Sequence, residues 1–337
     1  MGKKLILKLT LSSVAIILTV SILSTTVFAW GPATHTYLAK ELGNRCGIMN
    51  LQEMYGSVVP DMFNLMFGDP DQPYLWYQTH YNFMKVVDRA KFGKRKAFAY
   101  GFASHNEAWG ADFTAHIKAL TIDGDNSTDE EDNSVDEEKG YVIIKTKKLA
   151  PKLVPGIEAF LTAKDIPHTP ELVEELALRL ANPNIEFAVD VLVSENEDRH
   201  IGIRMLLAAR FRSLFIPTLL SRAYARDFAD YADITLEEAI LKIVWAEREF
   251  RGYMEVYGGI LTQENAAELM VDLGAQLAKT MLQKEYGIYV DPPREIMETC
   301  LFTAIDIVKD DYSDELEATL EYVDGQLKAH GVETCHW

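Results

Sequence analysis

Residues 97–120 read AFAYGFASHNEAWGADFTAHIKAL, and the spacing of their apolar side chains predicts one long helix. On such a helix, positions seven and eleven residues apart return to nearly the same angle. His105, Asp112 and His116 would therefore form one stripe along three turns. Two imidazoles and a carboxylate on one face suit Zn²⁺, and the length of the stripe favours a bridging Asp112 between two ions. The alternative is a set of core histidines with a buried aspartate partner.

The same helical periodicity continues along the rest of the chain, and strand-like alternation is nearly absent. We therefore expect an all-α, multi-helix bundle whose ligands project inward from facing helices. A soft boundary near 227–233 separates a metal-binding helical domain, 30–226, from extra C-terminal helices in 227–337 that could share its core. Besides 97–120, helices are predicted from Pro32 and over 75–87, 141–163, 171–181, 185–194, 201–224, 236–256, 266–284, 295–308 and 315–328.

The N-terminus has the features of an export signal. A lysine-containing start precedes an apolar run over 9–23, and Val27 and Ala29 fit the small-residue rule for cleavage after Ala29. Residues 1–29 are therefore predicted to be a signal peptide, with an uncleaved anchor as the alternative. The mature protein would begin at Trp30 and be secreted or periplasmic.

Composition excludes several classes of protein. The 337 residues include 48% hydrophobic residues, enough for a large core, and carry a formal charge of −18, which argues against general coating of nucleic acid. Three cysteines allow at most one disulfide, for which Cys300–Cys335 is our expectation, with Cys46 left over. The acidic stretch 123–138 is expected to be a surface loop that matches a calcium-binding loop only in part.

Three positions outside the long helix are also candidate metal ligands. After cleavage, the free α-amine and carbonyl oxygen of Trp30 could chelate an ion together with His35. Asp61 follows a proline at a turn, and His80 lies on the helix predicted over 75–87. Each of these positions also has an ordinary structural interpretation. Trp30 could be a simple chain terminus, Asp61 a turn or helix-cap residue, and His80 a histidine packed in the core.

The order of these motifs resembles the zinc-dependent phospholipase C family, which is related to the trinuclear-zinc single-strand nucleases. The resemblance covers about residues 30–193. It implies an all-α bundle that holds three zinc ions. By this resemblance, one ion takes Asp61, His80, His105 and Asp112, and a second takes Trp30, His35 and Asp112.

The third ion would take His116 and a His-x-x-x-Glu pair, and here the sequence departs from the family pattern. Glu186 matches the glutamate, but Asn182 stands at the histidine position. Asn182 followed by Pro183 is typical of a helix N-cap, so we expect this ion to be weakly held or absent, with Asp190 as an orienting residue or substitute ligand. Three extra residues between His105 and Asp112 are a second departure and predict a local helix distortion at Gly110.

The resemblance implies a secreted zinc-dependent phosphodiester hydrolase with two or three Zn²⁺ per chain. Metal-activated hydroxide would attack phosphorus, and Asp61 could also accept a proton. The substrate would be a phospholipid or another phosphodiester, with transient membrane-surface contact and no stable nucleic-acid partner. Trp76, Tyr77 and Trp109 could line a head-group pocket or simply pack in the core. The alternatives are a nuclease or nucleotidase on the same scaffold and a secreted metal-binding protein without catalysis.

Overall fold

The fold is all-α, as the sequence predicts. The computed structural model describes residues 30–43, 48–122 and 139–332. Within these ranges the β-pairing is limited to an isolated bridge between Lys118 and Lys139. The signal peptide, the acidic loop, Cys46 and Cys335 lie outside the described residues. The elements up to residue 163 are α2 (Pro32–Leu42), α3 (Ile48–Val58), the 3₁₀ turn η1 (Val59–Phe63), α4 (Gln72–Tyr81), α5 (Met84–Arg89), α6 (Gly93–His105), the π-helical turn η2 (Phe113–Ile117) and α7 (Tyr141–Ala163).

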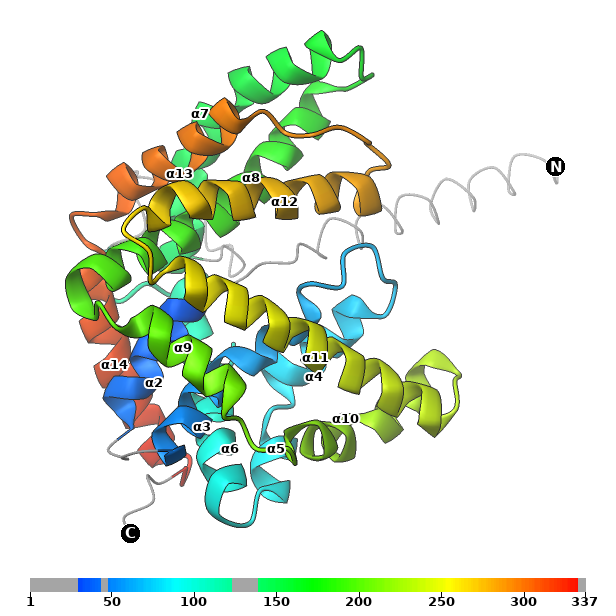
Figure 1. Cartoon of the computed structure of the whole chain (residues 1–337), viewed down its shortest axis with the longest axis vertical. Helices are drawn as coiled ribbons and strands as arrows, with labels where there is room; N and C mark the ends of the chain where they lie inside the picture. The colour runs from blue at the N-terminus through cyan, green and yellow to red at the C-terminus, as the bar shows by residue number, and fades with distance from the viewer. Residues whose placement is uncertain (1–29, 44–47, 123–138, 333–337) are drawn as a thin grey trace, which may run out of the picture.

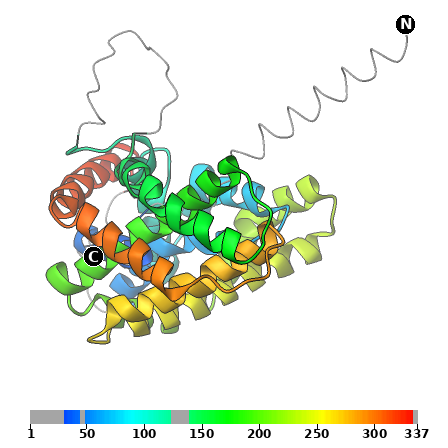
Figure 2. The ribbon, with the colours of Figure 1, turned by 90° about the horizontal axis from the view of Figure 1, so that it is seen from above.

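The helices gather into two groups that α11 links (Figure 1). In Figures 1 and 2, α7, α8, α12 and α13 pack together, while α3, α5, α6 and α10 form the opposite end. The helix α11 packs against α9 and α10, and it also contacts α12. The remaining elements are α8 (Pro170–Leu192), the π-helical turn η3 (Val193–Glu197), α9 (Ile201–Arg210), α10 (Ile216–Ala232), α11 (Leu236–Ile260), α12 (Ala266–Glu285), α13 (Arg294–Val308) and α14 (Tyr312–Ala329).

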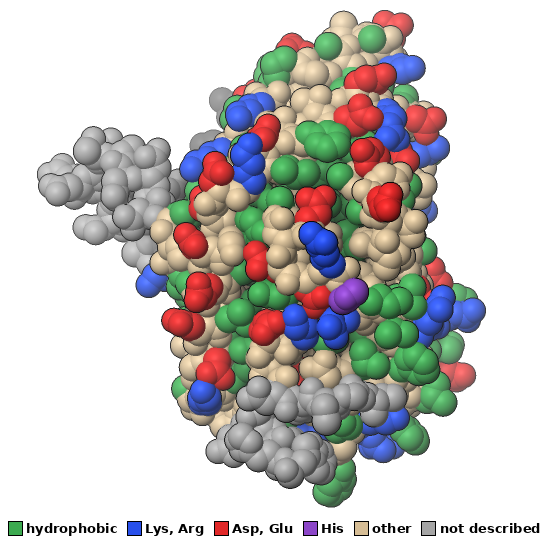
Figure 3. Space-filling model, turned by 60° about the vertical axis from the view of Figure 1, so that its left-hand side comes forward, with side chains coloured by type: hydrophobic (Ala, Val, Ile, Leu, Met, Phe, Trp, Pro, Cys, Tyr) green, Lys and Arg blue, Asp and Glu red, His purple; other side chains and the backbone are tan. Residues whose placement is uncertain are grey.

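A contiguous hydrophobic core extends through both groups of helices and includes residues on both sides of the boundary expected near 227. That boundary falls inside α10, which runs unbroken from Ile216 to Ala232. Acidic, basic and apolar side chains are interspersed on the face shown in Figure 3. Among the described residues, no helix is both long enough and apolar enough to cross a bilayer.

The prediction of one helix over 97–120 is wrong. The helix α6 ends at His105, and the side-chain oxygen of Asn106 accepts hydrogen bonds from the backbone N–H groups of Ala108 and Trp109 at 2.9 Å. An asparagine that bonds its own following backbone in this way favours a turn over a helix. The chain turns back at Gly110, where a Cβ would lie 2.5 Å from the carbonyl oxygen of His105. The local distortion expected at Gly110 is therefore a complete break.

The prediction of two helices over 171–181 and 185–194 is also wrong. They are one helix, α8, with Pro183 in its interior, and Asn182 is a mid-helix residue rather than an N-cap. Proline removes one backbone hydrogen bond and would normally break a helix. Here α8 packs against α7, α12 and α13, so tertiary packing keeps it continuous.

The helix predicted over 75–87 is interrupted as well. The structure has α4 ending at Tyr81 and α5 beginning at Met84, with Asn82 capping the end of α4. Similarly, the helix predicted over 201–224 is two helices, α9 and α10, which are separated by residues 211–215. In both cases the apolar spacing continues across the break, so periodicity alone does not detect it.

Candidate metal centre

Four of the predicted ligands meet at one point in the interior. Asp61, His80, His105 and Asp112 each offer one ligand atom within 4.8 Å of the others, and all four side chains are at most 1% exposed. The Nε2 atom of His105 lies 2.8 Å from Asp112 Oδ2, and the Nε2 atoms of His80 and His105 are 3.2 Å apart. We call these four residues the Asp/His cluster. They come from η1, α4, the end of α6 and the start of η2.

Local sequence explains how these side chains reach the cluster. Pro60 begins the short η1 turn that carries Asp61, and the hydroxyl of Thr79 on α4 donates to the carbonyl of Pro60 at 2.9 Å. This bond ties the helix of His80 to the turn of Asp61. The break after His105 then lets the chain reverse and bring Asp112 back against the imidazole.

The orientation of both imidazoles is set by backbone carbonyls. His105 Nδ1 lies 2.7 Å from the carbonyl of Ser57, and His80 Nδ1 lies 2.9 Å from the carbonyl of Trp76. A carbonyl oxygen only accepts, so each Nδ1 carries a proton and each Nε2 points into the cluster. Histidine ligands of metals are commonly held by such a bond from their second ring nitrogen.

A close crossing of α3 and α6 makes the His105 contact possible. A Cβ at Gly56 would lie 2.1 Å from the carbonyl oxygen of Phe98, and one at Gly101 would lie 1.9 Å from that of Glu53. Only glycine at both positions permits the two backbones to approach this closely. The approach places the Ser57 carbonyl within reach of His105.

Unpartnered oxygens mark the cluster as a plausible cation site. Asp61 Oδ2 and both side-chain oxygens of Asp112 are buried and lack a geometrically sound hydrogen bond. Buried polar atoms are normally satisfied, and the two Asp112 oxygens, which face the imidazoles of His35 and His105, fit an ion. The Asp61 oxygen nearer the imidazoles is Oδ1, which also accepts from Asn64. Two aspartates and two histidines are a donor set that suits Zn²⁺.

His35 borders the cluster from α2. Its Nε2 atom lies 3.1 Å from Asp112 Oδ1, and its ring stacks on that of His105 with centroids 4.1 Å apart. Asp112 therefore presents one oxygen toward His35 and the other toward His105. This is the arrangement that a bridging carboxylate requires.

Charges in the cluster are strongly coupled. Burial acts to raise the pKa of Asp61, but the positive charge of His105 and hydrogen bonds from His105 and His80 outweigh it and lower that pKa to about 2. Burial acts to lower the pKa of His105, yet Asp112 and Asp61 raise it well above its ordinary value. The pKa of His35 is lowered, first by burial and then by the charge of His105. In the metal-free protein, a proton on His105 thus supplies the positive charge that an ion would bring.

Asp190 anchors the segment that carries Trp30 and His35. Its two carboxylate oxygens accept four hydrogen bonds, from the backbone N–H groups of Ala33 and Thr34 and the hydroxyls of Thr34 and Tyr257, at 2.6–2.9 Å. Because these donors occupy both oxygens, Asp190 acts as a remote cap for the start of α2. Of the two roles expected for Asp190, these bonds favour that of an orienting residue.

Trp30 is buried beside this anchor. Its indole N–H donates to the hydroxyl of Thr114 at 3.1 Å, and its ring stacks on Tyr141 with centroids 5.3 Å apart. The residue that follows, Gly31, has room for no side chain, because a Cβ would lie 2.5 Å from a carboxylate oxygen of Asp190. The buried side chain of Trp30 therefore fixes the backbone that directly precedes α2.

Glu186 and His116, the residues expected at a third ion, each bond to a neighbouring side chain. Asn182 donates to Glu186 Oε1 at 2.7 Å, and its own oxygen accepts from the hydroxyl of Thr146 at 3.3 Å. Burial, and then the charges of Asp61 and Asp190, raise the pKa of Glu186 well above its ordinary value, and its second oxygen is unpartnered. His116 pairs elsewhere, through Nδ1, with Glu107 Oε1 at 2.5 Å.

Sequence reasoning missed three residues near the cluster. Glu107 holds His116, and its backbone N–H also donates to the carbonyl of His80 at 3.3 Å. Tyr257 and Tyr253 come from α11, in the part of the chain where no site residue was expected. Burial, together with the charges of Asp190 and Glu186, raises the pKa of Tyr253, so its phenol lies in the field of these carboxylates. Of these three residues, only Glu107 could have been suspected from the sequence, because it is an acidic residue two positions after His105.

Trp76, Tyr77 and Trp109, which were considered as the lining of a head-group pocket, lie in different environments. Trp76 stacks on His80 with centroids 4.5 Å apart, whereas Tyr77 is half exposed. Trp109 is buried and stacks on His330.

Comparison with protein-family models, with curated proteins and with solved structures gave no match for this chain.

Proposed function

We propose that the chain is a metal-dependent phosphodiester hydrolase of the phospholipase C type, with zinc in the Asp/His cluster. The observation that carries the proposal is the convergence of two aspartates and two histidines with unpartnered carboxylate oxygens in the interior. The order of the sequence motifs supports the zinc-dependent phospholipase C resemblance. Secretion through a cleaved signal peptide belongs to the same proposal.

In this proposal each residue has a defined task. His80 and His105 donate Nε2 lone pairs, Asp61 supplies a carboxylate oxygen, and Asp112 connects this set to His35. The main chain of Trp30 completes the ligand set at His35. Of the two tasks expected for Asp61, its low pKa favours that of ligand over that of proton acceptor.

Bound zinc would neutralise phosphate oxygens and make water nucleophilic near neutral pH. The protein would hold the ligands rigid through the carbonyls of Ser57 and Trp76 and through the Asp190 anchor. His116 is held by Glu107 through Nδ1 and Glu186 is held by Asn182 through Oε1, so a third ion would take the other ligand atom of each residue, while Asn182 offers an amide where an imidazole was expected. We therefore propose two ions as the tightly held set and a weak or absent third.

A metal-binding protein without catalysis is the second candidate. The specific observation in its favour is burial, since the side chains of the cluster are at most 1% exposed and a substrate phosphate needs direct access. A nuclease on the same scaffold is distinguished from a phospholipase by substrate alone.

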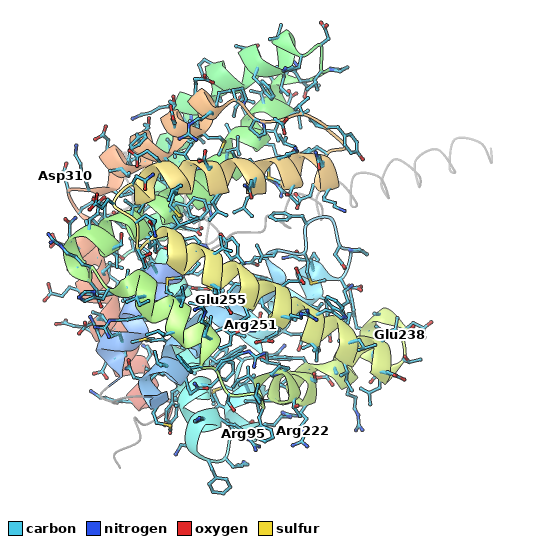
Figure 4. All side chains as sticks on the ribbon, in the orientation of Figure 1. Arg95, Arg222, Glu238, Arg251, Glu255 and Asp310 are labelled. Carbon is cyan, nitrogen blue, oxygen red and sulfur yellow. The ribbon has the colours of Figure 1, made fainter. Side chains whose placement is uncertain are left out.

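Metal content and hydrolysis measured on one preparation test the proposal. Zinc-loaded protein is assayed on a choline phospholipid, single-stranded DNA and a simple aryl phosphodiester, with His80→Ala as the inactive variant and exposed Asp310→Asn as the matched control (Figure 4). We expect phospholipid and aryl diester hydrolysis that is lost in His80→Ala and kept in Asp310→Asn. Full zinc occupancy with no turnover of any substrate would overturn the enzymatic proposal and support the second candidate. Turnover of DNA alone would assign a nuclease.

A further inference from the structure

A groove rich in basic side chains lies at the α5, α6 and α10 end of the molecule. Two adjoining surface pockets of about 520 and 600 Å³ share Arg89, Thr218 and Arg222 in their lining. Arg95 and Arg222 lie near one another at the lower end of the view in Figure 4. We call Arg89, Lys91, Arg95, Arg222 and Arg226 the basic groove.

The charge of the basic groove contrasts with that of the whole chain. Five basic residues face two acids in the lining, Asp88 and Asp227, and Lys85 already binds Asp227 at 2.7 Å. Arg222 and Arg226 are exposed and make no ion pair within the described part of the chain. In a protein of net charge −18, these side chains form a locally basic surface that favours anions.

Exposed apolar side chains flank the same groove. Phe92, in the connection between α5 and α6, is 84% exposed, and Leu214 and Phe215, between α9 and α10, are 86% and 59% exposed. The guanidinium of Arg95, in the first turn of α6, lies 4.7 Å from the centre of the Phe215 ring, so the start of α6 and the α9–α10 connection are in contact. Large apolar side chains grouped at two loop tips indicate a contact surface rather than random exposure.

From these observations we infer that the basic groove and its apolar tips dock onto an anionic phospholipid surface. Lipid phosphates would pair with the arginines, while Phe92, Leu214 and Phe215 would enter the interfacial layer. Nucleic acid would satisfy the arginines but not the apolar tips. The groove is separate from the Asp/His cluster. Phe92 precedes the first residue of α6, Gly93, whereas His105 is the last residue of α6, so the two ends of this helix lie roughly 18 Å apart at 1.5 Å per residue. The inference therefore goes beyond the proposed function and is tested without any activity.

Vesicle co-sedimentation tests this docking. The protein as purified, with its N-terminus verified by mass, is mixed with vesicles of phosphatidylcholine alone or with an equal part of phosphatidylglycerol. We compare Arg222→Glu/Arg226→Glu and Phe92→Ser/Leu214→Ser with matched controls at the other end, Lys147→Glu/Lys148→Glu and Tyr289→Ser. All substituted side chains are exposed, and circular dichroism checks that each variant is folded.

We expect wild type and both controls to bind the anionic vesicles, with weaker binding at high salt. The arginine variant should bind roughly tenfold or more weakly, and the apolar variant should also lose affinity. Equal binding by groove variants and controls would overturn the inference. A second result would also overturn it: binding of a single-stranded oligonucleotide that the arginine variant loses and the apolar variant keeps. That result would assign the groove to nucleic acid.

Discussion

Asp112 is the residue on which the metal centre depends most. It faces His35 with one oxygen and His105 with the other, at 3.1 and 2.8 Å. We predict that Asp112→Asn loses more zinc than either His35→Ala or His105→Ala, because an amide removes the charge that two ions would share. Metal analysis after gel filtration measures this, with Asp310→Asn as the control. Equal losses in all three variants would show that Asp112 does not bridge.

Asp190 is expected to matter for stability rather than for direct metal binding. Asp190→Ala leaves the buried backbone N–H groups of Ala33 and Thr34 without acceptors, at a cost of roughly 2–5 kcal/mol in the free energy of unfolding. Tyr257→Phe removes one of the same four bonds and should cost about 1 kcal/mol. Urea denaturation of both variants measures the difference. If Asp190→Ala were as stable as Tyr257→Phe, the anchor would not hold α2.

At the scale of elements, the crossing of α3 and α6 is the most constrained contact. Gly101→Ala would place a methyl group against the carbonyl of Glu53 and push the helices apart. We predict a loss of several kcal/mol in stability together with lower zinc content, because the Ser57 carbonyl then loses its contact with His105.

Gly252→Ala is the matched control for Gly101→Ala. This glycine lies inside α11 with no atom near the position of a new Cβ, so alanine should stabilise the protein by about 0.5–1 kcal/mol. Thermal unfolding of the two variants should therefore shift in opposite directions. Shifts of the same sign would mean that close approach at Gly101 is not limiting.

The helices predicted correctly from the sequence are those in which the apolar periodicity and the tertiary packing favour the same boundaries. Helix type follows from periodicity along most of the chain, but the breaks do not. The turn at Asn106 depends on a side chain that competes for backbone hydrogen bonds, and the continuity of α8 across Pro183 depends on neighbouring helices. Both effects outweigh local propensity and leave no trace in the apolar spacing.

The sequence identified the residues of the Asp/His cluster, but not the backbone path that brings them together. Sequence motifs indicated the members of the Asp/His cluster and His35, yet His105 and Asp112 meet because the chain reverses, not because they share a helix face. The role of Asp190 depends on a partner segment 157 residues away, and that of Glu107 on a side-chain rotamer. Neither follows from spacing along the chain.

At the scale of the whole molecule, pH should act through the coupled charges of the cluster. The lowered pKa of Asp61, about 2, stabilises the metal-free protein above pH ~4, and this contribution is lost as the pH falls toward 2. The raised pKa of His105 stabilises the metal-free protein below pH ~6.5, and that contribution is lost as the pH rises through the raised value.

Zinc binding to the Asp/His cluster, as proposed, would displace the proton on His105, so the increase in melting temperature on adding zinc should be larger at pH 8 than at pH 5.5. Thermal scans of chelator-treated protein across this range measure it, with calcium as the control cation. A zinc-induced shift that does not vary with pH would contradict exchange between ion and proton at this histidine.

The bond from Asp190 to α2 also sets an order of events during synthesis. It joins residues 157 positions apart, and ribosomes add about 5–20 residues per second, so α8 emerges about 8 to 30 s after α2. Throughout that interval the helix that carries His35 lacks this cap, although the hydroxyl of Ser57 can already donate to the carbonyl of His35. The residues of the Asp/His cluster are thus all synthesised before the aspartate that anchors α2, and the His35 side of the candidate centre is fixed only after more than half of the chain has been made.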